Sequence, residues 1–291
     1  MNSSEADVLP FPVRALRPSD APAWRQWQPE TGAGRVRLRD FDPGAQPFST
    51  GDKAANKAAV ESLADELDEL QELFYADGCF KLLLVLQGMD TSGKDGTVRG
   101  VFSRTSPLGV HTVGWKAPTE RERAHDYLWR IHQQAPGAGE IMVFNRSHYE
   151  DVLVPVVNRW ITPEQTRQRY RHINEFERLL AETGTVILKC LLHISHGEQR
   201  KRLQARIDNP SKHWKFSPGD VEVRRQWDDY QLAYEDLLNA TSTAWAPWTI
   251  VPADSKLHRN LMIATLVRDC LKALPLRYPP ENPALAGLRI D

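Results

Sequence analysis

Gly88-Met89-Asp90-Thr91-Ser92-Gly93-Lys94-Asp95-Gly96-Thr97 is the segment of this chain that says most about its architecture. It directly follows an apolar run, residues 82–86, which reads Leu-Leu-Leu-Val-Leu. A buried strand that passes through a Gly-x4-Gly-Lys turn into a helix is the layout of a phosphate-binding P-loop. Gly88 and Gly93 permit the tight backbone path, and the free N–H groups of the loop and of the helix start attract phosphate oxygens. Lys94 adds a point charge, so we expect a protein that binds a nucleotide or another phosphorylated chain.

The residue after the lysine departs from the ordinary Walker A motif, in which a Ser or Thr hydroxyl binds Mg2+ at this position. Here the position is Asp95, and a second acid, Asp90, lies inside the loop. Two carboxylates would repel bare phosphates, but a carboxylate that holds Mg2+ would be bridged to them by the metal. We therefore predict that Asp90 binds the metal and that Ser92, Gly96 and Thr97 join Asp95 and the two loop glycines in binding phosphate or nucleotide. The alternative is a glycine-rich turn with a solvent-facing lysine.

Length and composition are those of a globular α/β protein. The chain has 291 residues and a net charge of −1, which gives no general indication of a nucleic acid or membrane partner. Its three cysteines are far apart and have no metal-ligand spacing, which is typical of core residues in a reduced protein. No apolar stretch reaches the length of about 18 residues that suggests a membrane helix, and no signal peptide is evident. We expect a cytoplasmic protein.

The order of the predicted elements indicates the fold class. Near-continuous apolar runs predict strands that alternate with helices, which favours a doubly wound parallel sheet with helices on both faces. We divide the chain into an N-terminal arm (1–50), which we expect to be loosely ordered, a P-loop domain (51–275) and a C-terminal tail (276–291). A helix is expected at 53–76, and Thr119, Thr162 and Ser217 stand where helices should begin. The strands are expected at 81–87, 110–114, 141–145, 185–194 and 248–252.

A second polar cluster follows the strand expected at 141–145. The carboxyl ends of parallel strands face the ligand crevice, so we expect Asn145 and Arg146 to lie near the P-loop. Arg146 can clamp phosphate with its planar guanidinium group, and Asn145 can offer a neutral oxygen to Mg2+ but cannot act as a base. The alternative is a helix N-cap with incidental charge.

Basic residues gather in a third segment, at about 196–220, which we interpret as a helical lid. Arg202 and Arg206 lie four residues apart and so share a helix face. A break at residues 208–210 would let Lys212 and Lys215 fold back over transferring phosphoryl groups. A solvated charged face is the alternative for this segment. Lys116, after the second strand, is a further candidate for binding the phosphate tail or the acceptor nucleotide.

Taken together, these motifs resemble the polyphosphate kinase 2 family over about residues 36 to 275. The Gly-Lys-Asp-Gly loop and the Lys-x-Trp-Lys lid motif are specific, because neither suits an ordinary ATP-using kinase. The resemblance implies a fold close to thymidylate kinase, homo-oligomers, and Mg2+-dependent transfer of phosphoryl groups between inorganic polyphosphate and a nucleotide, with Mn2+ as a substitute metal. It also implies that the P-loop holds polyphosphate rather than nucleotide. The matching segments are 86–97, 145–147, 212–217, 227–230 and 246–248.

The chain departs from most of that family at one position. Most members carry Asp-Arg-Ser where this chain has Asn145-Arg146-Ser147, and many have a Glu near the position of Pro155. This pattern resembles the subfamily that phosphorylates both AMP and ADP. A missing carboxylate would lower the repulsion of acceptors that bear one or two phosphates.

These observations predict a reversible transfer of the terminal phosphoryl group of polyphosphate to AMP or ADP. We expect Asp90, Lys94, Asn145, Arg146 and Arg206 to be the catalytic residues, with Asp90 and Asn145 holding the metal. Two other functions remain open: an ATP-dependent nucleoside monophosphate kinase and a non-catalytic polyphosphate- or nucleotide-binding module. Asp95 argues against the first, and the arginine-rich lid argues against the second. The sequence does not indicate the preferred base, the direction of the reaction or the chain length of polyphosphate.

Overall fold

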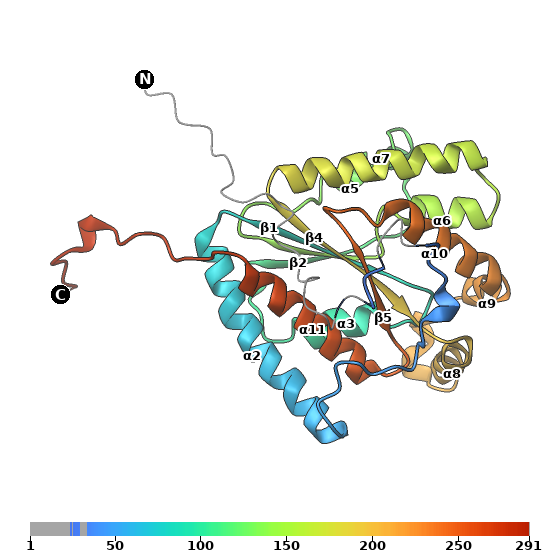
Figure 1. The fold of residues 1–291 in the computed structure, drawn as a ribbon, viewed down its shortest axis with the longest axis horizontal. Helices are drawn as coiled ribbons and strands as arrows, with labels where there is room; N and C mark the ends of the chain where they lie inside the picture. The colour runs from blue at the N-terminus through green and yellow to red at the C-terminus, as the bar shows by residue number, and fades with distance from the viewer. Residues whose placement is uncertain (1–23, 25, 30–33, 291) are drawn as a thin grey trace.

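The computed structural model describes residues 24, 26–29 and 34–290, and its centre is a five-stranded parallel sheet (Figure 1). The strand order is β2-β3-β1-β4-β5. All five predicted strands are confirmed, with the fourth ending one residue earlier than expected. Their bounds are β1 (Lys81–Gln87), β2 (Val110–Gly114), β3 (Ile141–Asn145), β4 (Thr185–His193) and β5 (Trp248–Pro252).

Helices cover both faces of this sheet, which confirms the predicted doubly wound α/β class (Figure 1). Helix α11 packs along α2 and against α3, while α6, α7 and α10 pack together on the other side. Helices α4, α5, α8 and α9 lie in the connections between these elements. The helical bounds are α2 (Lys53–Asp77), α3 (Lys94–Val101), α4 (Glu120–Arg123), α5 (Trp129–His132), α6 (Glu150–Val157), α7 (Pro163–Glu182), α8 (His196–Ile207), α9 (Pro218–Arg225), α10 (Trp227–Thr241) and α11 (Lys256–Ala273).

The registers of the strands bring the two predicted polar clusters together. Six consecutive residues of β1 are buried, as expected of a central strand covered on both faces. Leu86 of β1 pairs with Asn145, the last residue of β3, and Leu86 O accepts a hydrogen bond from the N–H of Arg146 at 3.0 Å. The P-loop after β1 and the Asn145-Arg146 pair after β3 therefore emerge side by side.

The helix starts follow the predicted capping chemistry in two of three cases. Thr119 and Thr162 each form a complete capping box, in which side chain and backbone satisfy one another. Ser217 instead accepts a hydrogen bond from the N–H of Gly219, two residues on. Asp220, in the first turn of the same helix, forms an ion pair with Arg206.

Part of the expected N-terminal arm packs closely on the domain, which differs from the loose order that we predicted. Val36 and Leu38 are buried, although proline, glycine and charge dominate the segment around them. The N–H of Phe48 donates to Nε2 of His258, and the carbonyl of Phe41 pairs with Nε2 of His193. A short 3-10 turn, η3 (Leu38–Asp40), lies in this segment. Residues 1–23, 25 and 30–33 of the expected arm lie outside the described residues.

The C-terminal tail follows α11 and leaves the domain surface (Figure 1). Residues 277–290 are exposed, and they contain only a short 3-10 turn, η5 (Pro283–Leu285). This agrees with the proline-rich sequence, which cannot continue the helix. None of the helices in the described part of the chain is long and apolar enough to cross a bilayer.

Candidate active site

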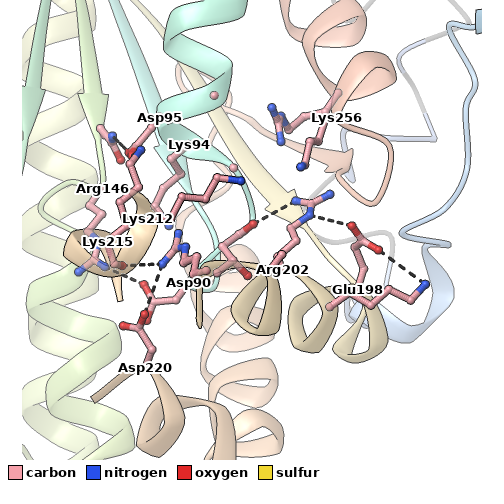
Figure 2. A pocket seen from close by; sticks show the side chains of 18 of the residues that line it. Asp90, Lys94, Asp95, Arg146, Glu198, Arg202, Lys212, Lys215, Asp220 and Lys256 are labelled. Carbon is pink, nitrogen blue, oxygen red and sulfur yellow. Dashed lines mark hydrogen bonds and ion pairs between the residues drawn. The ribbon is translucent and has the colours of Figure 1, made fainter. Parts of the chain in front are cut away.

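A cavity of about 690 Å3 opens between the P-loop, the end of β3, and helices α8 and α11 (Figure 2). Lys94, Arg146, Lys212 and Lys215 gather on one side of it, and Arg202 and Lys256 lie on the other. Most of the predicted site residues line this cavity, from all three sequence segments. They are Asp90, Gly93, Lys94, Asp95, Gly96, Asn145, Arg146, Arg206, Lys212 and Lys215.

Lys94 is the first residue of α3, and its ammonium group folds back onto the loop. Its Nζ donates to the carbonyl oxygens of Gly88 at 2.6 Å and Met89 at 3.3 Å. Burial and the nearby charge of Arg146 together lower the pKa of Lys94 to about 8, against the opposing effect of the neighbouring carboxylates. The lysine is thus held where an arriving anion would stabilise its charged form.

The two loop glycines are required by the backbone geometry. Gly88 has φ +146° and Gly93 has φ +110°, both of which are strained for residues with a side chain. A Cβ on Gly93 would also overlap the guanidinium group of Arg259. Ser92 and Thr97 are fully buried beneath the loop, and neither hydroxyl has a hydrogen-bond partner within the described residues. Gly88, Ser92 and Thr97, which we predicted to bind phosphate or nucleotide, do not line the cavity.

Asp95 connects the P-loop to β3 and to the lid. Nδ2 of Asn145 donates to Oδ1 of Asp95 at 2.8 Å, and Nζ of Lys215 lies 3.3 Å from Oδ2. Burial alone would raise the pKa of Asp95, but the hydrogen bonds from Asn145 and Lys215 lower it overall. This carboxylate is therefore charged, and it ties the lid to the loop.

Arg146 and Asp90 form the second contact across the cavity. The guanidinium group of Arg146 donates to Oδ1 of Asp90 at 2.7 Å, and Arg146 adopts φ +67°. A left-handed conformation is uncommon for a residue with a side chain, and such residues cluster at functional sites. Glu150, in the first turn of α6, stabilises the charge of Arg146, while burial raises the pKa of Glu150 itself. Glu150 was not among the predicted site residues.

The lid reaches the cavity through α8, the 3-10 turn η4 (Pro210–Lys215) and α9. Arg206 donates to the carbonyl oxygen of Lys215 at 2.9 Å and to Asp220 at 3.3 Å. Burial and the nearby charge of Asp90 raise the pKa of Asp220. The predicted lid is thus folded over the P-loop, and Trp214 within it remains 79% exposed.

Two buried arginines that line the cavity also brace the P-loop, a role that was not predicted for them. Arg202 donates to the carbonyl oxygens of Thr91, Ser92, Ala253 and Asp254 at 2.7–3.1 Å. Arg259 donates to Ser92 O at 3.2 Å. No clear signal in the sequence pointed to the second, because Arg259 is one of several charged and polar residues in α11.

Lys116 does not line the cavity. Its side chain is exposed, and its carbonyl oxygen accepts a hydrogen bond from Arg130 at 2.9 Å. The structure therefore separates Lys116 from the other predicted phosphate-binding residues.

The oxygen donors near the P-loop have the chemistry that Mg2+ prefers. Arg146 occupies one oxygen of Asp90, and Asn145 uses its amide nitrogen for Asp95, which leaves a carboxylate oxygen and an amide oxygen for a metal. The described residues contain no cluster of three or more His, Cys, Asp or Glu side chains that could hold a metal ion. Magnesium is commonly bound by one or two carboxylates together with substrate phosphates, so the two predicted donors fit it.

The sequence of the chain matches a known protein family. A family model, polyphosphate kinase 2 (PPK2), matches residues 50–277, which is more than half of the chain. The chain belongs to this family. The resemblance that the motifs suggested is confirmed, and the matched residues contain the P-loop, the end of β3 and the lid.

Individual relatives match over most of their length. An AMP/ADP-polyphosphate phosphotransferase of Meiothermus ruber is 50% identical over 258 residues, covering 89% of this chain and 97% of the relative. An ADP-polyphosphate phosphotransferase of Rhodopseudomonas palustris is 41% identical, covering 77% of this chain and 82% of the relative. The crystal structure of polyphosphate kinase 2 from Arthrobacter aurescens TC1 superimposes with a TM-score of 0.86 at 44% identity, covering 89% and 92% of the two chains.

Proposed function

We propose that this protein transfers the terminal phosphoryl group of inorganic polyphosphate to AMP and to ADP, giving ADP and ATP, in a reversible Mg2+-dependent reaction. The observation that carries the proposal is the charge of the cavity, whose lining has nine lysines and arginines against four acids. The similarity to the Meiothermus ruber relative, named for both AMP and ADP, supports the pair of acceptors.

The excess of positive charge favours a polyanion over an ordinary nucleotide donor. All four acids are already paired with cations of the cavity: Asp90 with Arg146, Asp95 with Lys215, Glu198 with Arg202, and Asp220 with Arg206. The lining cations that form no ion pair within the described residues come from α3, η4 and α11, and they are Lys94, Lys212, Lys256 and Arg259. A chain of phosphates would satisfy such a set of charges, because each phosphate unit brings its own negative oxygens.

The reaction that fits this geometry is an in-line displacement. An ionised phosphate oxygen of the acceptor attacks the terminal phosphorus, and the bond from that phosphorus to the bridging oxygen breaks. The released polyphosphate is one phosphate shorter and carries the charge of the broken bond. Because the attacking oxygen is already ionised, the reaction needs little base catalysis. The rate enhancement then comes mainly from positioning the reactants and neutralising the charge of the phosphates.

Different residues of the cavity would have different roles in this transfer. Lys94 and the amides of the loop hold the terminal phosphate, and Arg146 and Arg206 stabilise its equatorial oxygens. Lys212 and Lys215 close the lid over the reacting groups and exclude water. Asp90 and Asn145 would hold Mg2+, which when bound supplies additional positive charge to the phosphates.

The test is nucleotide chromatography after the pure protein is mixed with Mg2+ and long-chain polyphosphate, first with AMP alone and then with ADP alone. ADP and ATP formed from AMP, without added nucleoside triphosphate, would support the proposal in full. If ATP forms from ADP but AMP gives no product, polyphosphate would still be supported as the donor, but AMP would be excluded as an acceptor. Product formed only after ATP is added would indicate a nucleoside monophosphate kinase, and binding without product would indicate a binding module.

We also propose that the enzyme is a cytoplasmic homo-oligomer. The thiols of Cys190 and Cys270 are free and buried, which fits a reducing compartment that also contains the nucleotide acceptors. Light scattering coupled to size-exclusion chromatography tests the oligomer, and a monomer at micromolar concentration would contradict it.

A further inference from the structure

The turn that follows β3 is anchored by side chains that take no part in the mechanism above. Ser147, His148 and Tyr149 come directly after Arg146, and all three are fully buried. Polar side chains in a protein interior need hydrogen-bond partners, so three in succession require polar surroundings. Tyr149 does not line the active-site cavity. Its partners therefore act on the backbone of the turn and not on a ligand.

The hydroxyl of Tyr149 is the centre of these polar surroundings. It donates to Oε1 of Glu177 at 2.7 Å and accepts from Nζ of Lys189 at 2.8 Å. Nζ of Lys189 also donates to Oε2 of Glu177 at 2.6 Å and to the carbonyl oxygen of Thr241 at 2.7 Å. Nε2 of His148 lies 3.2 Å from Oε1 of Glu177. The turn is thereby tied to α7, β4 and α10, which carry these partners.

The direction of these hydrogen bonds follows from the chemistry of the groups. An ammonium group has only donors and a carboxylate has only acceptors, so the single proton of the Tyr149 hydroxyl points at Glu177. Burial and the negative charge of Glu177 raise the pKa of Tyr149 well above its ordinary value of 10.0. The phenol therefore stays protonated at physiological pH, and the network has one arrangement.

Such a network contributes more to geometry than to stability. Two charges that enter a protein interior lose hydration energy comparable to their attraction, and well-packed apolar residues of similar volume often stabilise a fold as well. Apolar side chains cannot supply a set of directional contacts that is satisfied in a single arrangement. Glu177, Lys189 and Tyr149 supply that set at the point where the chain leaves β3.

Arg146 is the residue whose placement depends on this arrangement. Its backbone is left-handed, with φ +67°, a conformation that costs energy and persists where the surrounding structure imposes it. On one side the N–H of Arg146 donates to Leu86 O at 3.0 Å, and on the other side the buried network holds Tyr149. The guanidinium group then projects into the cavity, where it contacts Asp90 at 2.7 Å (Figure 2).

We infer that Tyr149 is a positioning residue, which together with Glu177 and Lys189 holds the turn so that Arg146 meets the phosphoryl group in transfer. The inference rests on the proposed function, in which Arg146 stabilises that group. Misplacement of a group that stabilises developing charge lowers the rate of the chemical step more than it weakens binding. Loss of the Tyr149 hydroxyl should therefore lower kcat and leave the KM values for both substrates nearly unchanged.

The test removes this hydroxyl with Tyr149→Phe, and Tyr170→Phe is the matched control. Tyr170 is a buried tyrosine of α7 whose hydroxyl forms no hydrogen bond with the turn. After Tyr149→Phe, the carboxylate of Glu177 still contacts Lys189 and His148. No buried charge is left unpaired, so we expect the variant to fold.

The values of kcat and KM are measured with long-chain polyphosphate and ADP, in the wild-type background and in an Arg146→Ala background. We expect Tyr149→Phe to lower kcat about tenfold in the first background, with both KM values within about twofold. In the second background there is no guanidinium group to place, so the same change should alter kcat by less than about twofold. Tyr170→Phe should alter kcat by less than about twofold in either background.

A loss of the same size in both backgrounds would mean that the hydroxyl acts on the fold as a whole, and it would overturn the positioning role alone. A kcat of Tyr149→Phe that matches the control, or a loss that appears in KM, would do the same. A poorly folded variant would lose activity in both backgrounds, and urea unfolding of each protein would show it. Wild-type protein that transfers no phosphoryl group from polyphosphate would overturn the proposed function and the inference with it.

Discussion

Asn145, the last residue of β3, donates from its side-chain amide to the carboxylate of Asp95 at 2.8 Å. Asp95 directly follows the P-loop lysine, so one hydrogen bond joins the two polar clusters that the sequence places 50 residues apart. Nζ of Lys215 contacts the other oxygen of the same carboxylate and brings in the lid. An aspartate in place of Asn145 could not donate this bond, and it would place a second negative charge against Asp95.

Asn145→Asp should therefore change the choice of acceptor. We expect kcat/KM for AMP to fall relative to that for ADP by about fivefold or more, which corresponds to about 1 kcal/mol. The reason is that ADP carries a further phosphate that can share Mg2+ with the new carboxylate, whereas AMP does not. Initial rates with each acceptor, at saturating polyphosphate, give the ratio. An unchanged ratio in a folded variant would contradict the role that we assign to Asn145.

Lys94→Ala should abolish most of the activity while the domain stays folded. Lys94 is the buried cation of the loop, and loss of one preorganised charge-stabilising group costs about a hundredfold or more in kcat. The matched control is Lys116→Ala, because Lys116 was predicted to bind phosphate but does not line the cavity. We expect the control to keep kcat within about twofold of the wild type. Similar activity in the two variants would refute the assignment of Lys94.

The lowered pKa of Lys94 predicts a pH dependence of substrate capture. In the free enzyme Lys94 loses its proton as the pH rises through about 8, so kcat/KM for polyphosphate should decline above that pH. Bound phosphate favours the charged lysine, and kcat should therefore decline at a higher pH than kcat/KM. Lys94→Arg should shift the decline in kcat/KM upward, because arginine stays protonated. A profile of kcat/KM that is flat through this range would contradict the prediction.

The lowered pKa of Lys94 should make the folded protein more stable as the pH rises, although it lowers kcat/KM. Between about 8 and the ordinary value of 10.5, the unfolded chain holds a proton on Lys94 that the folded protein has lost. The contribution of Lys94 to the free energy of unfolding should then increase as the pH rises through this window. Urea unfolding of the wild type and of Lys94→Met, measured across the window, isolates this contribution. A difference between the two proteins that does not vary with pH would count against it.

Local signals in the sequence predicted most of the fold and part of the site. The strand-loop-helix order around Lys94 and the apolar strands depend on neighbouring residues, and the structure agrees with both. The roles of Arg202 and Arg259 depend on contacts between elements that lie more than 100 residues from the P-loop, which a linear reading cannot place. The position of Lys116, which does not line the cavity, likewise depends on how β2 and the following helices pack.

Arg202→Lys should be a damaging change despite the retained charge. Arg202 satisfies four carbonyl oxygens, from the P-loop and from the loop after β5, through two different nitrogens. A lysine ammonium is a single point on a flexible stem and cannot hold both loops at once. We expect the free energy of unfolding to fall by about 2 kcal/mol and kcat to fall with it. The exposed Arg225→Lys on α9 is the control, and equal urea midpoints for the two variants would contradict the bracing role.

Glu177 and Lys189 form a fully buried ion pair behind the site, with Nζ of Lys189 at 2.6 Å from Oε2 of Glu177. Lys189 also donates to the hydroxyl of Tyr149 and to the carbonyl of Thr241, so its donors are satisfied. Burial raises the pKa of Glu177, but Lys189 and His148 lower it overall, and the carboxylate is charged. Removing one charge of such a pair leaves the other buried and uncompensated.

Glu177→Gln should therefore lower the free energy of unfolding by about 3–5 kcal/mol. Adding Lys189→Met should recover part of that loss, because the double variant contains no unpaired buried charge. The matched control is Glu175→Gln, on the same helix, whose exposed ion pair with Arg178 should contribute less than about 1 kcal/mol. Urea unfolding of the wild type and of the three variants measures each of these changes in the free energy of unfolding. If Glu177→Gln were no worse than Glu175→Gln, or if the double variant were less stable than Glu177→Gln, the pair would not carry the buried charges as described.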